Sequence, residues 1–236
     1  MRSFFVAAAV AASLFAVPPA SAHHLWIEAD DGGAKIFFGE FGENLREASP
    51  GTLDKMEPKA KLVTPAGERP LEVRKTANGF AVPGRPGAGE SIVADDARYP
   101  VYTGTRDGKT TRSIYWPAAR LAGDRAPSAA VLDLDVVPVA GDKFQVVFKG
   151  KPLPNAKVEI ITPSGWGREA HTGEDGSFAV ALPWRGTYVF EVHHNDRTPG
   201  KRGEDAYDVM NYVTSLTVVQ PQGLEPLPAP PPAKPH

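Results

Sequence analysis

Short runs of β-branched and aromatic residues alternate with polar residues along most of the chain, and clusters of Gly, Pro, Asn and Asp separate these runs. A period of two predicts β-strands, and the apolar spacing of an amphipathic helix is almost absent. The predicted strands cover residues 24–28, 34–38, 60–63, 71–75, 79–82, 90–97, 102–105, 111–117, 132–138, 143–148, 157–162, 169–172, 177–181, 186–194 and 213–219. The pattern therefore predicts an all-β protein.

A break in this pattern at residues 121–128 (LAGDRAPS) divides the chain. We predict two consecutive β-sandwich domains of the immunoglobulin or transthyretin-like kind, at residues 23–127 and 128–220. Residues 221–236 (PQGLEPLPAPPPAKPH) are rich in proline and nearly free of large side chains. This composition predicts an extended, disordered tail, because the segment cannot bury enough apolar surface to offset its ordering entropy.

Residues 1–22 have the three parts of an export signal. Arg2 supplies the positive charge, the apolar run FFVAAAVAASLFAV follows, and ASA offers small residues before a cleavage site. The apolar run is shorter than the stretch of about 20 residues that spans a bilayer, which favours a removable signal over an anchor. We therefore predict a periplasmic protein whose mature form begins at His23.

Charge and cysteine content narrow the function classes. The formal net charge is only −2, which excludes the strong basic character of a nucleic-acid binder. The chain contains no cysteine, so disulfides, thiolate metal sites and cysteine nucleophiles are excluded. Metal chemistry must therefore come from His, Asp, Glu, Met or a new amino terminus.

The predicted mature chain begins with two histidines, His23 and His24. A free α-amine titrates at about 7.7–8.0, so a metal ion displaces its proton easily. The amine and the ring of His23 could form a histidine brace with a second imidazole, an arrangement suited to copper. Alternatively, the amine, the next amide nitrogen and the ring of His24 begin a square-planar site for Ni(II) or Cu(II). The sequence leaves both arrangements open.

A second histidine pair closes the strand predicted at 186–194. Strand alternation places Glu191 and His193 on one face, and places His194 on the face that carries the apolar residues. Two residues that lie two positions apart on one face could act as paired ligands, or as a ligand and the group that orients it. The predicted metal ligands are therefore His23, His24, Glu191, His193 and His194.

The second half resembles the transthyretin-like or carboxypeptidase-regulatory-like β-sandwich. The resemblance rests on GKPLPNAKV at 150–158, TGEDGSF at 172–178 and PWRGTYVFEV at 183–192. The residues agree with it, because the Asp-Gly pair suits a hairpin turn and Phe178, Val180 and Leu182 alternate onto one face. Such modules are mostly scaffolds, so this resemblance concerns architecture.

Two further motifs are HHLWIE at 23–28 and EVHHNDRTPG at 191–200. With them, the mature chain as a whole is similar to bacterial periplasmic proteins of formally unknown function that are grouped with NikM-like nickel/cobalt uptake components. The resemblance implies a binding protein for a divalent transition metal (Ni, Co or Cu), which acts as an accessory in metal uptake and not as an enzyme. It implies a membrane metal transporter or an outer-membrane receptor as partner. By position it assigns the ligands to His23 and His194, with Glu191 and Asp196 as flanking acids.

Two other functions fit parts of the sequence. Four tryptophans could form a sugar-stacking platform of a carbohydrate-binding or adhesion module that needs no metal; they are Trp26, Trp116, Trp166 and Trp184. A copper monooxygenase with a histidine brace would require an axial aromatic residue, for which Tyr207 and Tyr212 are the candidates.

Overall fold

The computed structural model describes residues 23–30, 32–106 and 108–235, and these residues form an all-β protein, as predicted. The predicted signal peptide at 1–22 lies outside the described residues. Among the described residues, helical structure is limited to two short 3-10 turns, η1 (Phe41–Glu43) and η2 (Thr52–Lys55). No helix in this part of the chain is long and apolar enough to cross a membrane.

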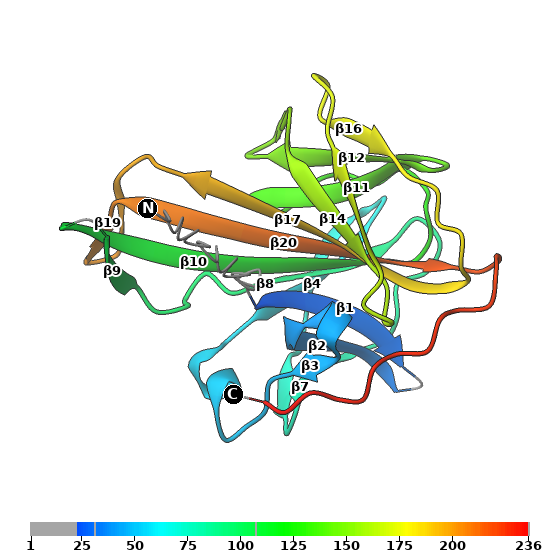
Figure 1. Ribbon diagram of the computed structural model, residues 1–236, viewed down its shortest axis with the longest axis horizontal. Coiled ribbons are helices and arrows are strands. Elements are labelled where there is room, and N and C mark those ends of the chain that lie inside the picture. The colour runs from blue at the N-terminus through cyan, green and yellow to red at the C-terminus, as the bar shows by residue number, and fades with distance from the viewer. Residues whose placement is uncertain (1–22, 31, 107, 236) are drawn as a thin grey trace, which may run out of the picture.

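A long sheet, here called the central sheet, runs through the middle of the molecule (Figure 1). Within the described residues its strands follow the spatial order β15-β14-β17-β20-β10-β8-β4-β5, and β9 pairs with β10. They are β4 (Lys59–Thr64), β5 (Gly67–Leu71), β8 (Ser91–Asp95), β9 (Tyr102–Arg106), β10 (Lys109–Ala122), β14 (Lys157–Ile161), β15 (Gly167–His171), β17 (Gly186–Asp196) and β20 (Val209–Gln220).

The central sheet joins the two halves of the chain. Strand β10 from the first half pairs in parallel with β20 from the second half, in a register that aligns Ser113 with Val209 and Leu121 with Thr217. The other pairs of the central sheet are antiparallel. The regions predicted as two sandwich domains therefore share one sheet.

The first outer sheet lies below the central sheet in Figure 1. Its strands are β1 (His24–Asp30), β2 (Gly33–Glu40), β3 (Leu45–Arg46), β6 (Arg74–Thr76) and β7 (Gly79–Pro83). Leu25, Ile27 and Ile36 of this sheet pack against Ala119 and Leu121 of β10 in one buried apolar cluster. This cluster is the core of the first half.

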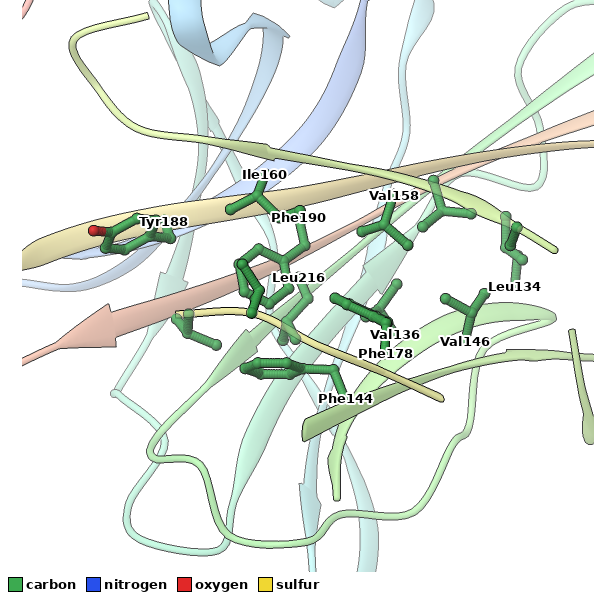
Figure 2. Close-up of a cluster of buried hydrophobic side chains, with 14 of the residues drawn as sticks. Leu134, Val136, Phe144, Val146, Val158, Ile160, Phe178, Tyr188, Phe190 and Leu216 are labelled. Carbon is green, nitrogen blue, oxygen red and sulfur yellow. The ribbon is translucent and has the colours of Figure 1, made fainter. Parts of the chain in front are cut away.

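The second outer sheet covers the opposite face of the central sheet (Figure 1). Its strands are β11 (Leu134–Ala140), β12 (Lys143–Phe148), β13 (Lys151–Pro152) and β16 (Ser177–Ala179). Figure 2 shows its residues Val136, Phe144 and Phe178 packed against Phe190 and Leu216 of the central sheet. Strand β10 serves both cores, since Ile114 faces this cluster while the neighbouring Tyr115 faces the first.

The transthyretin-like features of the second half take the predicted local form. Gly176 has a φ of +72°, and Asp175 accepts hydrogen bonds from Ser177, as the Asp-Gly turn requires. Phe178, Val180 and Leu182 all join the core shown in Figure 2. A small hairpin of β18 (Gly200–Arg202) and β19 (Asp205–Tyr207) precedes β20.

A buried ion pair fixes the connection between the halves. Arg120 of β10 donates to both carboxylate oxygens of Asp135 of β11 at 3.0 and 2.6 Å, and both side chains are fully buried. The same guanidinium donates to Ser128 and to the carbonyl of Ala129. The ion pair therefore attaches the segment that links the two halves to the central sheet.

The proline-rich segment runs back along the surface toward the first outer sheet (Figure 1, red). Leu224 forms a β-bridge with Trp184, and Asn44 bonds the backbone of Pro230 and of Ala233. Most of its side chains are exposed. The composition of this segment predicts disorder, but these bonds attach it to the fold. Its prolines lower the entropy cost of ordering, because they fix the extended backbone in advance.

Candidate functional site

The first strand places His24 beside β17. Strand β1 alternates, so Leu25 and Ile27 enter the core of the first half while His24 and Trp26 face the other way. Trp26 packs with Val189 of β17 in a small buried cluster, and its ring lies 5.4 Å from that of His24. On β17 every second residue faces the same side, so this face carries Val189, Glu191 and His193. Glu191 and His193 therefore lie on the side of β17 that His24 faces.

Glu191 lies between two histidines from opposite halves of the chain. Its Oε2 is 3.0 Å from Nδ1 of His24, and its Oε1 is 2.5 Å from Nε2 of His193. His24 and Glu191 are buried, with 2 % and 6 % of their surface exposed, whereas His193 lies at the surface. Burial alone raises the pKa of Glu191, but the electrostatic interaction with His24 and the hydrogen bond with His193 outweigh it and lower that pKa.

The imidazole of His24 is incompletely bonded. Neither ring nitrogen has a hydrogen-bond partner among the described residues, since the carboxylate of Glu191 is close to Nδ1 but outside hydrogen-bond geometry. A buried polar atom without a partner costs about 1–3 kcal/mol, and such atoms are rare in folded proteins. This ring is therefore the group of the cluster best placed to accept a ligand.

The ring of His23 is held by two carboxylates instead. Its Nε2 lies 2.6 Å from Oε1 of Glu47, and its Nδ1 lies 3.3 Å from Oε1 of Glu40. Both glutamates are buried, and the hydroxyl of Tyr115 donates to the backbone carbonyl of His23. These contacts position the first residues of the predicted mature chain.

Gly39 allows the two glutamates to reach His23. It has a φ of +144°, and a Cβ atom there would lie 2.3 Å from the carbonyl oxygen of Leu45. Without a side chain at this position β3 pairs with the end of β2, and Glu47 follows β3 directly. Neither Glu40 nor Glu47 is among the ligands predicted from the sequence; the close repeat of Gly and Glu in FGEFGEN at 38–44 was the available signal for Glu40.

The structure places His194 away from this cluster. It follows His193 on β17, so it points to the opposite face of the central sheet, as strand alternation predicts. There its ring lies 4.3 Å from that of Phe148, beside Tyr212. Burial is the first cause that lowers the pKa of His194. A site shared by His194 and His24 would have to cross the sheet.

Asp196, the flanking acid assigned by the resemblance, is engaged by a lysine. Nζ of Lys149 donates to its carboxylate at 2.8 Å, and Thr198 adds a backbone hydrogen bond. The hydrogen bond from Lys149 is the largest cause that lowers the pKa of Asp196 to about 2.

Replacing Lys149 by methionine is therefore expected to raise the pKa of Asp196 from about 2 toward 3.8, its ordinary value. The pair stabilises the folded chain above that ordinary value, and this contribution is lost as the pH falls toward about 2. An NMR titration of the Asp196 carboxyl carbon measures the change. An unchanged pKa in the variant would show that Thr198 alone holds the carboxylate.

The cluster brings together three of the five predicted ligands, His24, Glu191 and His193, whereas the ring of His23 lies against Glu40 and Glu47. In the described part of the chain, no three His, Asp or Glu side chains are arranged so that they could hold a metal ion by themselves. A metal would therefore need a further donor, and the amine that cleavage after residue 22 would create on His23 is a candidate. Among side chains, the ring of His24 fits a metal best, because neither of its nitrogens has a hydrogen-bond partner among the described residues and imidazole nitrogen is a preferred ligand of Ni and Cu.

A known family matches part of the second half of the chain. Residues 131–196 match a family described as "Domain of unknown function (DUF4198)". This region contains the second outer sheet, Glu191 and both histidines of the second pair. No curated protein matches the chain.

Proposed function

We propose that the protein is a periplasmic accessory protein that binds a divalent transition metal, nickel or cobalt with copper as the alternative, and that it acts in metal uptake and not as an enzyme. The metal is its cargo, and a membrane metal transporter or an outer-membrane receptor is its partner. The buried imidazole of His24 carries this proposal, because neither of its nitrogens has a hydrogen-bond partner among the described residues and it lies beside Glu191. The resemblance to the NikM-like group and the position of His24, second in the predicted mature chain, support it.

The geometry favours chelation through His24 over a brace made by the ring of His23. Both ring nitrogens of His23 lie against carboxylates, so that ring serves as an anchor. The free amine of His23 and the ring of His24 would bind the metal, with the amide nitrogen between them closing the chelate. Glu191 and His193 would supply or orient further ligands. A copper monooxygenase is less well supported, because Tyr212 faces the opposite side of the central sheet.

The test compares two forms of the protein. Protein exported and processed to begin at His23 is expected to bind one Ni(II) or Cu(II) per chain in calorimetric titration. A form with Ala-Pro placed before His23 is expected to bind at least about 100-fold more weakly, as loss of a ligand requires. Proline is chosen because its nitrogen carries no proton, so the extension cannot rebuild the chelate.

Two controls accompany the comparison. A His171→Gln variant of the processed protein removes an exposed histidine on β15 and is expected to bind as the parent does. Both forms must show the same far-UV circular dichroism. Equal affinity of the processed and the extended forms would contradict the amine as a ligand.

A further inference from the structure

The structure separates the four tryptophans that the sequence suggested as a platform. Trp26 is fully buried, and Trp166 and Trp184 pack edge to face with ring centres 4.7 Å apart. Trp116, by contrast, is half-buried and lines an open pocket of about 340 Å³. The four residues therefore form no common platform, and Trp116 alone leads to a pocket with polar groups around it.

This pocket lies on the face of the central sheet against which the second outer sheet packs. Its walls come from β4, β8, β10 and β20 and from the segment that enters β11. The lining side chains that can interact with a ligand are Lys59, Lys61, Asp95, Trp116, Asp133 and Tyr212. Ala97 and Ala118 line it as well, and their small side chains leave space above the sheet.

An aromatic wall and a carboxylate are fixed together on one side. The rings of Trp116 and Tyr212 stack with centres 5.8 Å apart and planes 29° apart. The indole nitrogen of Trp116 donates to Oδ2 of Asp95 at 3.1 Å, and the Tyr212 hydroxyl donates to Oδ2 of Asp133 at 3.4 Å. These bonds hold the wall in place, and each of them uses one oxygen of a carboxylate that lines the pocket.

The charges of the pocket balance. Two lysines and two aspartates line it, Lys59 on β4 is the cross-strand partner of Asp95 on β8, and Lys61 also bonds Glu68. A strongly charged ligand of either sign would meet like charges in this lining. A neutral ligand with many hydroxyl groups would find donors on the lysines and acceptors on the aspartates, and charged partners make hydrogen bonds roughly twice as strong as neutral ones.

We propose that this pocket binds a neutral sugar ring, with one apolar face of the ring against Trp116 and its hydroxyl groups bonded to Asp95, Asp133 and Lys59. Pockets for small ligands are typically apolar and aromatic with a few placed polar groups, and this one has that composition. The site is separate from the proposed metal site. Trp116 and Tyr115 are neighbours on β10, and they face opposite sides of the central sheet.

The test uses ¹⁵N-labelled protein in the presence of EDTA, so that metal binding plays no part. Methyl β-D-glucopyranoside, methyl β-D-galactopyranoside, methyl α-D-mannopyranoside and N-acetylglucosamine are added one at a time up to tens of millimolar. We expect at least one of them to shift the indole N–H signal of Trp116 in a saturable way and to leave that of Trp166 in place. Trp116→Ala is expected to weaken binding, followed by backbone signals of β8, by about tenfold or more.

Asp133→Asn provides a second variant in case Trp116→Ala fails to fold, since Asp133 is exposed. It is expected to weaken binding several-fold without altering the rest of the spectrum. Trp166→Phe is the matched control and should bind as the parent does. The proposal is overturned if no sugar saturates the Trp116 signal. It is equally overturned if ethylamine or inorganic phosphate, added in parallel, shifts that signal while the sugars do not.

Discussion

Replacing Arg120 by methionine is expected to lower the free energy of unfolding by about 3–5 kcal/mol, the cost of breaking a buried ion pair. The variant would leave the carboxylate of Asp135 fully buried, and the backbone N–H groups of Val131 and Leu132 would be its remaining donors among the described residues. It would also remove the bonds that hold Ser128 and Ala129. Denaturant unfolding measures the loss.

Arg112 offers a matched control on the same strand. It pairs with Asp208, but both side chains are about half exposed, at 49 % and 40 %. Exposed pairs contribute about 0–1 kcal/mol, so Arg112→Met should cost no more than that. Similar losses for the two variants would show that burial does not decide the contribution of Arg120.

Much of the fold follows from local alternation, which the sequence displays directly. The turn at Asp175-Gly176 and the apolar face of Phe178, Val180 and Leu182 are examples, because both depend on neighbours within a few residues. The parallel pairing of β10 with β20 is different. It joins two strands from opposite halves of the chain, and no local pattern specifies such a partner, so the sequence predicts two consecutive sandwiches without predicting the sheet that they share.

In the candidate site, too, local patterns could be predicted from the sequence and long-range contacts could not. Alternation was enough to place Glu191 and His193 on one face of β17 and His194 on the other. The approach of β1 to β17, which brings His24 to Glu191, depends on the packing of Trp26 against Val189 and could not be predicted locally. Glu47 was missed for a related reason, because its position depends on the close approach of β3 to Gly39.

If the proposed function holds, the two neighbouring histidines of β17 should contribute very differently to metal affinity. We expect His193→Ala to weaken Ni(II) binding by the processed protein by about 10–100-fold, the range found when a group that orients a metal ligand is removed. His193 bonds Glu191, which in turn lies 3.0 Å from His24. His194→Ala is expected to leave the affinity within about twofold, because its ring packs on Phe148 on the other face of the sheet, although it should cost some stability.

A third variant, His24→Phe, tests the central ligand and keeps a ring of similar shape beside Trp26. We expect it to abolish tight binding while the protein stays folded, because phenylalanine leaves no unsatisfied nitrogen at a site that is 2 % exposed. Calorimetric titration and denaturant unfolding of all three variants separate affinity from stability. Loss of metal affinity in His194→Ala with no loss in His193→Ala would instead support the ligand that the family resemblance assigns. Such a result would move the site to the opposite face of the central sheet, where Lys149 already holds Asp196.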